Sequence, residues 1–326
     1  MTSSLFATSI LPALNGQAYS PAGGLFILEG TVYPFAPAPP SFILNDGTGY
    51  WCGFASGVAG GACNLADGMW ACSRLASNNP LLPAFGYPAK TTPMWPSVQT
   101  GRINVGISSV NFANAYHAKT GSLDGLVLTY TAWSQGVMAL LQWFFNDVLP
   151  ANGVHHWLLP YVYRMYCFGD PFRCPGVAHG NEIAGMPMPP KLDGQVTGGI
   201  GGPLDYTVAQ ANLLAPDGKF LIYSFVNEND LYADSPCGSS PWTTLPSVGS
   251  VEYLFFQLIM QPSLTLFIKL ATLLGKPIGD VEALVNTGEF FGAGNNAGHF
   301  QYFTAMDAAV NDLVTLGNSL PRQPGY

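Results

Sequence analysis

The stretch "YTAWSQGVMALLQWFF", residues 130–145, decides the interpretation of this chain. An apolar run ends in "AWSQG", residues 132–136, and a segment with the apolar spacing of an amphipathic helix follows at once. A serine between a buried strand and a helix is the layout of a nucleophile elbow, whose usual motif is G-x-S-x-G. Ala132 replaces the first glycine by the next smallest residue, and Gly136 keeps the second. The motif alone is common by chance, but with a strand and a helix around it we predict that Ser134 is a nucleophile.

The segments around this turn predict an α/β fold. The run "GLVLTYTA", residues 125–132, is apolar without alternation, as in a strand of a parallel sheet that is buried on both faces. Alternation of such runs with helical patterns indicates a largely parallel central sheet flanked by helices. We predict strands in 41–45, 125–132, 157–169 and 219–227, and helices in 135–147, within 250–288 and in 300–317.

The domain organisation follows from composition along the chain. Residues 1–40 are rich in Pro, Gly and Ala and are predicted to form an N-terminal arm, with one α/β-hydrolase domain over 41–326. The apolar stretch 254–275 is interrupted by Gln257, Gln261, Pro262 and Lys269, which argues against a membrane-spanning helix. We expect a helical insert over about 240–290, serving as core or as a lid over an apolar substrate.

A nucleophilic serine needs a histidine as base. In α/β-hydrolases the order along the chain is Ser, then Asp or Glu, then His. His179 and His299 are the two histidines well beyond Ser134, and His179 precedes most of the acidic strand ends. His299 lies in the glycine-rich "GAGNNAGHFQYF", directly before the last helix, and is the predicted base. His155 and His156 are expected to be a solvated pair at a turn.

The acid that orients the histidine has two serious candidates. Asp170 ends the strand that follows the serine helix, and Asp230, in "VNENDLYADSP", ends the next strand. The usual hydrolase acid lies on the later strand, which favours Asp230, with Asp234 as an outsider. Asp170 is followed by proline and is equally suited to capping a turn.

The oxyanion of the tetrahedral intermediate needs two hydrogen-bond donors. The backbone N–H of Gln135, directly after the serine, is the first predicted donor. The second is expected in the turn after the first strand, where "NDGTGY" offers Gly47 and Thr48.

The composition excludes some functions. Hydrophobic residues make up 48% of the 326 residues and charged residues only 9%, which favours an apolar ligand or an assembly interface. The net charge of −8 argues against nucleic acid. The N-terminus lacks the basic start of a signal peptide. The cysteines have no C-x-x-C spacing that would suggest zinc, and their redox state is left open; they are Cys52, Cys63, Cys72, Cys167, Cys174 and Cys237.

Several of these segments together resemble the lysin B esterases of phages that infect mycobacteria, which are cutinase-like α/β-hydrolases. The most specific is the unusual string before the serine strand, and the others are the serine turn, two acidic strand ends, the glycine-threonine turn and the histidine loop. The resemblance covers about residues 41–318, and two positions depart from it, Ala132 for the usual Gly and Asp46 for the usual His. The segments are "YPAKTTPMWPSVQTG" (87–101), "WSQG" (133–136), "FGDPFRCPG" (168–176), "NDLYAD" (229–234), "DGTG" (46–49) and "GHFQY" (298–302).

The resemblance implies a serine esterase with Ser134, Asp230 and His299 as triad, Thr48 and Gln135 at the oxyanion hole, and no metal or organic cofactor. The implied substrate is the lipid ester between mycolic acids and arabinogalactan in the mycobacterial envelope, where a phage-encoded enzyme acts at lysis or from the virion. A different class of function is a virion tail protein that keeps the fold for assembly or envelope binding and associates with other virion proteins. A cutinase or lipase of cellular origin is less consistent with the lack of a signal peptide.

Overall fold

The fold is built on a five-stranded parallel sheet with the order β2-β1-β3-β4-β6. The computed structural model describes residues 23–28, 70–73, 87, 93–188, 196–236, 251–281 and 297–319. The strands are β1 (Gly23–Leu28), β2 (Trp70–Ser73), β3 (Val127–Trp133), β4 (Val162–Phe168) and β6 (Ile222–Phe225). Every residue of β3 is buried, as its unbroken apolar run predicts.

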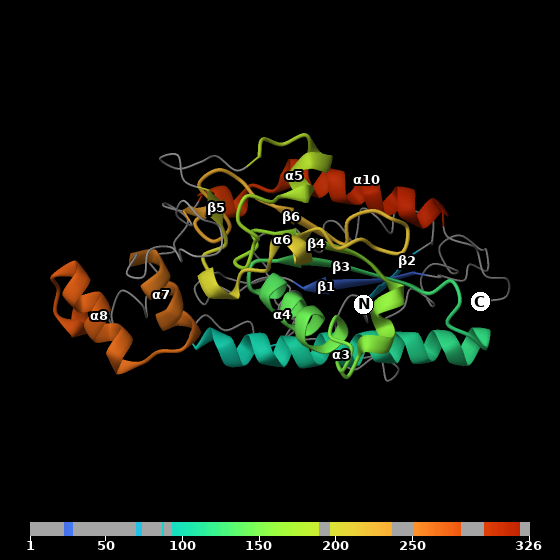
Figure 1. Ribbon diagram of the computed structural model, residues 1–326, viewed down its shortest axis with the longest axis horizontal. Helices are drawn as coiled ribbons and strands as arrows, with labels where there is room; N and C mark the ends of the chain where they lie inside the picture. The colour runs from blue at the N-terminus through green and yellow to red at the C-terminus, as the bar shows by residue number, and fades with distance from the viewer. Residues whose placement is uncertain are drawn as a thin grey trace, which may run out of the picture.

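Helices cover both faces of the sheet (Figure 1). The long helix α3 (Met94–Thr120) and α4 (Gln135–Trp143) lie on one face, and α5 (His179–Ala184) and α10 (Phe303–Ser319) lie on the other. α3 and α4 approach closely at Gly101, where a Cβ atom would lie 2.7 Å from the Cβ of Ala139. This α/β architecture confirms the predicted fold class.

Shorter elements connect these layers. α4 continues into one turn of π-helix, and a 3₁₀ helix precedes β4. A two-stranded antiparallel sheet lies outside the main sheet. The elements are η2 (Phe144–Val148), η3 (His156–Tyr161), β5 (Thr197–Gly198), η4 (Gly202–Leu204), α6 (Val208–Ala211) and β7 (Ser235–Pro236).

The apolar stretch 254–275 forms two helices. α7 (Val251–Met260) and α8 (Leu264–Leu274) form a hairpin at one end of the molecule (Figure 1). The chain turns at Gln261 and Pro262, and the side chain of Ser263 caps α8 by accepting a hydrogen bond from the N–H of Leu266. Among the described residues, no helix is both long and apolar enough to cross a bilayer.

Strand β1 corrects the predicted N-terminal arm. Residues 23–28 form an inner strand of the sheet, between β2 and β3, so this part of 1–40 belongs to the central sheet. The prediction failed because glycines and prolines surround the short apolar run "GGLFIL", which pairs with two neighbouring strands. The strand predicted at 41–45 lies outside the described residues, and residues 70–73, where no strand is predicted, form β2.

The last helix is fixed to the sheet by a charged cluster. Arg164 of β4 is completely buried and donates from Nε to Asp312 of α10 at 3.0 Å. The Tyr166 hydroxyl donates to the same carboxylate at 2.7 Å, and Asp217 pairs with the other side of the guanidinium. The loop that contains His299 directly precedes α10. Because the cluster holds α10 against the sheet, it also helps to position this loop.

Candidate active site

Ser134 occupies a strained turn between β3 and α4. Its backbone has φ 52° and ψ −119°, and it is one of the two non-glycine residues with positive φ in the described part of the chain. Such a conformation is costly for a residue with a Cβ atom and is typical of functional turns, including the nucleophile elbow. The N–H of Ser134 donates to the carbonyl oxygen of Phe168 at 2.9 Å, which ties the turn to the end of β4. The side chain is 8% exposed.

The residues on either side of Ser134 are held by tight packing. Ala132 is completely buried and pairs in register with Leu28 of β1 and Cys167 of β4, so a small side chain suits this position. Gln135 is buried at the first turn of α4, where its side-chain oxygen accepts a hydrogen bond from the hydroxyl of Ser97 in α3 at 3.1 Å. The N-terminal turn of α3 therefore lies directly beside the predicted nucleophile.

Asp230 and His299 are in direct contact. Nδ1 of His299 lies 3.0 Å from both carboxylate oxygens of Asp230, and both side chains are buried. They come from different parts of the chain, Asp230 from the loop after β6 and His299 from η6 (Ala297–Phe300). A carboxylate at Nδ1 accepts a hydrogen bond from the Nδ1–H group and so makes Nε2 the basic nitrogen of the neutral ring, as in a serine hydrolase triad.

The carboxylate of Asp230 is held by further donors. The hydroxyl of Tyr302 donates to Oδ2, and the backbone N–H groups of Tyr232 and Ala233 donate to Oδ1 at 2.9 and 3.2 Å. Burial alone would raise the pKa of Asp230, but the charge of His299 and these hydrogen bonds outweigh it and lower the pKa below its ordinary value. Asp230 therefore stays ionised, although it is completely buried.

The histidine loop is bound to the serine turn through Trp133. The indole N–H of Trp133 donates to the backbone oxygen of His299 at 3.3 Å, and the two rings lie 5.0 Å apart. On another side, Gly169 leaves room for the pair, since a Cβ atom there would lie 2.6 Å from Cε1 of His299 and 3.0 Å from Oδ2 of Asp230. The ends of β3, β4 and β6 thus bring the predicted serine turn and the Asp-His pair to one edge of the sheet.

Asp170, the alternative acid, has different partners. Its carboxylate accepts hydrogen bonds from the N–H of Phe172 at 2.8 Å and from the hydroxyl of Ser224 at 3.4 Å, as a turn-capping residue does. Burial raises its pKa to about 6. Asp234, the outsider, accepts from the N–H of Asn229, and burial raises its pKa as well. The contacts around His299 therefore favour Asp230 over both.

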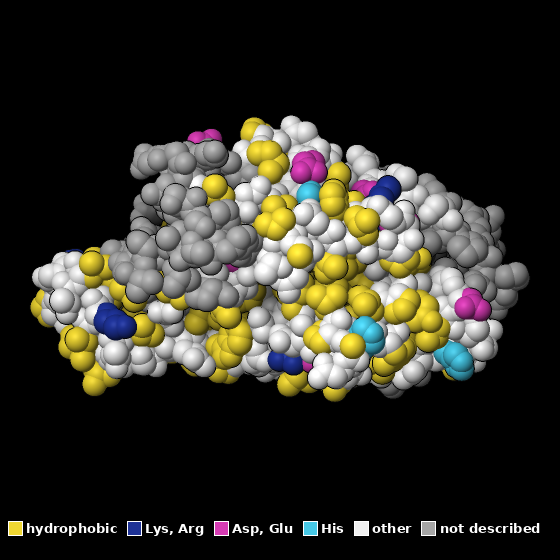
Figure 2. Space-filling model, viewed as in Figure 1, with side chains coloured by type: hydrophobic (Ala, Val, Ile, Leu, Met, Phe, Trp, Pro, Cys, Tyr) yellow, Lys and Arg dark blue, Asp and Glu magenta, His cyan; other side chains and the backbone are white. Residues whose placement is uncertain are grey.

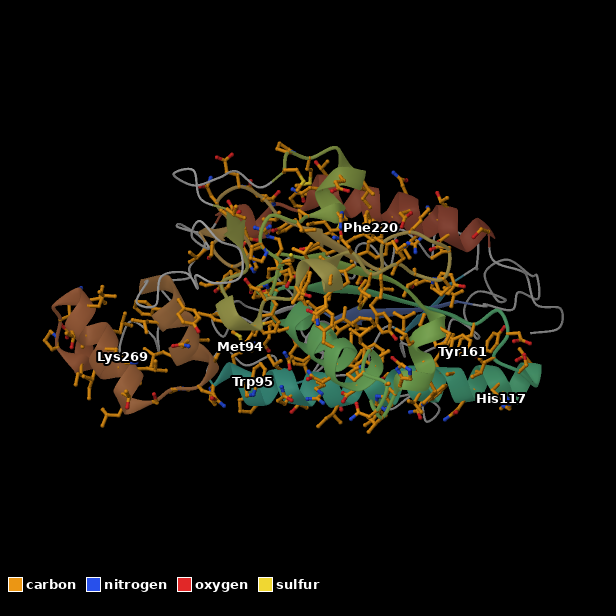
Figure 3. All side chains as sticks on the ribbon, viewed as in Figure 1. Met94, Trp95, His117, Tyr161, Phe220 and Lys269 are labelled. Atoms are coloured by element: carbon orange, nitrogen blue, oxygen red, sulfur yellow. The ribbon has the colours of Figure 1, made fainter. Side chains whose placement is uncertain are left out.

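Three other histidines, His155, His156 and His179, have structural partners. His179 lies flat on Phe220, with ring centroids 3.6 Å apart, and its nitrogens face Glu182 and Asn212 (Figure 3 labels Phe220). His155 accepts a hydrogen bond from the indole of Trp143 at 3.0 Å, and His156 contacts the backbone oxygen of Val148. The pair at 155 and 156 is therefore bound to the end of α4 and to η2, and it is half-buried rather than fully solvated.

Of the predicted donors to the oxyanion, only Gln135 lies within the described residues. Gln135 lies where the elbow predicts, and Gly47 and Thr48 lie outside the described residues. The strand next to β3, on the side away from β4, is β1, whose last residue Leu28 pairs with Ala132. The sequence continues from Leu28 with Glu29, Gly30 and Thr31, a second Gly-Thr pair.

A groove opens beside this edge, between the start of α3, η4 and the α7–α8 hairpin. Its volume is about 1010 Å³, and most of the side chains that line it are apolar or aromatic. Figure 3 shows Met94 and Trp95 at the end of α3 that faces the hairpin. The lining residues are Pro93, Trp95, Pro96, Gly201, Leu204, Tyr253, Phe256, Gln257, Met260, Gln261, Pro262, Ser263 and Leu266.

A metal site is not found in the part of the chain that the structure describes, where no three His, Cys, Asp or Glu side chains are grouped to hold an ion. Cys167 and Cys174 are buried thiols, and the side chains of the other four cysteines lie outside the described residues.

Three residues of this site were missed by the sequence analysis. Trp133 is the variable position before the serine, Gly169 directly follows β4, and Tyr302 is three residues beyond His299. Only Tyr302 had a usable signal, since its phenol follows a predicted base in the same loop. The roles of Trp133 and Gly169 depend on contacts between distant segments.

Comparison with known proteins supports the fold. No protein-family model matches the chain, and no curated protein sequence matches it. Among solved structures, the crystal structure of lysin B from Mycobacteriophage D29 is similar with a TM-score of 0.55 and 20% sequence identity, over 90% of this chain and 99% of that one. A cutinase-like protein from Cryptococcus sp. aligns with 80% of this chain and 99% of its own, at 11% identity and a TM-score of 0.35. The likeness to lysin B confirms the predicted fold class, an α/β fold with a parallel sheet flanked by helices.

Proposed function

We propose that this protein is a serine esterase that hydrolyses lipid esters. The observation that carries the proposal is the buried contact between Asp230 and Nδ1 of His299, beside the strained turn of Ser134. An ionised carboxylate at Nδ1 orients an imidazole as general base, and a serine in an elbow turn is the group such a base activates.

The reaction proceeds in two steps. Nε2 of His299 takes the proton of the Ser134 hydroxyl while Oγ attacks the acyl carbonyl carbon, and the imidazolium is stabilised by Asp230. The same proton then passes to the leaving alcohol, and an acyl-enzyme remains. Water, deprotonated by His299, attacks the acyl carbon and releases the carboxylic acid together with regenerated Ser134.

The oxyanion needs a second donor besides the N–H of Gln135. Thr48 is the predicted one, and Thr31 is its competitor because it follows the strand whose end pairs with Ala132. Loss of one oxyanion donor lowers kcat by about 10²- to 10³-fold. We expect a loss of this size from either Thr31→Val or Thr48→Val, and steady-state kinetics of both variants identify the donor. If both variants keep the wild-type kcat, the second donor is not the hydroxyl group of either threonine.

The apolar groove indicates the acyl side of the substrate. Its aromatic and aliphatic walls suit a hydrocarbon chain, and its α3 wall is continuous with the turn that contacts Gln135. The likeness to lysin B suggests the mycolic acid ester of arabinogalactan as the natural substrate, with action at the envelope of a mycobacterial host.

Hydrolysis of p-nitrophenyl butyrate and palmitate tests the chemistry. We expect the wild type to cleave both esters and Ser134→Ala to lose about 10⁴-fold or more in kcat. Ser108→Ala is the matched control, because this serine is also buried but lies in α3. An inactive wild type contradicts the esterase proposal, and an active Ser134→Ala contradicts the nucleophile.

Release of mycolic acids from purified mycolyl-arabinogalactan, followed by thin-layer chromatography, tests the substrate. Cleavage of the p-nitrophenyl esters without release of mycolic acids would leave the esterase standing and remove this substrate.

A virion protein with this fold is a second candidate, favoured by the exposed large apolar side chains on several elements. Mass spectrometry of purified phage particles distinguishes a structural component from an enzyme that is released at lysis. Presence in the particle together with esterase activity would combine the two functions.

A further inference from the structure

The α7–α8 hairpin differs in charge from the rest of the chain. The described segment 251–281 contains Lys269 and Lys276 against Glu252 and Asp280, so its net charge is zero, whereas the whole chain has a net charge of −8. This part of the molecule is therefore neutral in an otherwise acidic protein, and α8 itself carries Lys269 and no Asp or Glu. A partner of negative charge would meet least repulsion here.

The outer face of α8 is also apolar. Leu270 and Ala271 are buried, whereas Leu264 is 68%, Ile268 46% and Leu273 49% exposed. Ile278, just beyond the helix, is 40% exposed, and both lysines are exposed. Figure 2 shows a basic side chain with hydrophobic side chains around it on this hairpin, and Figure 3 labels Lys269 on α8.

Exposed leucines and isoleucines next to lysines are typical of helices that lie in a membrane interface. The apolar side chains enter the boundary between headgroups and acyl chains, and the long lysine stems let the ammonium groups reach the headgroups. A lysine near an anionic surface strengthens binding by roughly five-fold. The two remaining residues on this face, Thr265 and Thr272, are neutral and do not oppose contact with a membrane.

We propose that the outer face of α8, together with Ile278 and Lys276, docks the protein on an anionic lipid surface. The first turn of α8 supplies Ser263 and Leu266 to the groove, so docking by this helix brings the groove to the lipid. The inference extends the proposed esterase function, but it concerns binding and does not depend on the chemistry of Ser134.

Co-sedimentation with vesicles tests this docking surface. The probes are vesicles of equal parts phosphatidylglycerol and phosphatidylcholine, and vesicles of phosphatidylcholine alone, each at low and high salt. We expect wild-type protein to bind the anionic vesicles, less strongly at high salt. Leu264→Gln/Ile268→Gln and Lys269→Gln/Lys276→Gln should each weaken this binding by about ten-fold or more, and the lysine variant should lose the salt dependence.

Ile103→Gln/Ile107→Gln is the matched control, because these side chains of α3 are 60% and 42% exposed on another part of the surface. All variants should keep the wild-type rate on a soluble short-chain ester, which separates failed docking from failed catalysis or folding. Absence of wild-type binding to anionic vesicles, or an equal loss in the α3 control, overturns the proposal. A wild-type dimer that Leu264→Gln/Ile268→Gln dissociates, without vesicle binding, overturns it in favour of a second copy of the chain.

Discussion

The loops after β4 and β6 each present a completely buried aspartate at the same edge of the sheet, Asp170 and Asp230. Around Asp170 the partners are a backbone N–H and neutral hydroxyls, and burial raises its pKa to about 6. Around Asp230 a histidine, a phenol and two backbone N–H groups converge, and the pKa falls below its ordinary value. Position at a strand end and depth of burial are the same in both loops. The hydrogen-bond partners decide which carboxylate is suited to stabilise an imidazolium.

Exchange of each aspartate for asparagine tests this difference directly and should have the largest effect on kcat. Asp230→Asn removes the charge that stabilises the His299 imidazolium and permits the wrong tautomer, so we expect kcat to fall by about 10⁴-fold. Asp170→Asn keeps the turn-capping oxygen and should leave kcat close to that of the wild type. Kinetics on p-nitrophenyl butyrate check both. A larger loss in Asp170→Asn than in Asp230→Asn would exchange their roles.

A second variant tests the point where the two loops approach each other, at Gly169, which directly precedes Asp170. Gly169 has φ +57°, and a Cβ atom there would lie 2.7 Å from Nδ1 of His299. Gly169→Ala should displace the Asp-His pair and lower kcat by about 10²-fold, because a misplacement of about 1 Å is costly to a catalytic group. Gly185→Ala is the control, since that glycine also has positive φ (62°) but a Cβ atom there meets no neighbour within 4 Å. Equal losses of activity would point to backbone strain as the cause.

The dependence of stability on pH gives the smallest of these effects. Asp170 has a folded-state pKa of about 6, above its ordinary value of 3.8, so its contribution to stability is fully present only below about pH 4 and is lost as the pH rises through 6. Relative to Asp170→Asn, the wild type should therefore lose about 2 kcal/mol in the free energy of unfolding between pH 4 and pH 7. Urea denaturation of both proteins across this range measures the difference. A difference that is constant with pH would contradict the raised pKa.

The sequence alone was sufficient to predict the three candidate catalytic residues and their order along the chain. It was not sufficient to predict the residues that hold them in place. Ser134, Asp230 and His299 each follow a recognisable apolar run or glycine-rich loop, so strand ends and chain order single them out. Trp133 and Gly169 act through contacts with His299, more than a hundred residues away along the chain, and no local pattern encodes such contacts.

Two elements of the fold were hidden for physical reasons. In β1 the tertiary packing overrides a local composition that favours loops. In α3 a proline and glycines weaken the helical pattern. Pro96 is tolerated because it lies in the first turn, where backbone N–H groups have no helical partner, and Gly101 is required by the close approach of α4.

The hydrogen bond between Trp133 and His299 spans 166 residues of sequence. Contacts of such separation form only after a large loop of chain has been closed, which delays them relative to local helices and turns. The histidine loop can reach the serine turn only when the strands between them are in place. Recovered esterase activity during refolding would therefore report completion of the native topology, at a stage when helical circular dichroism is already largely restored.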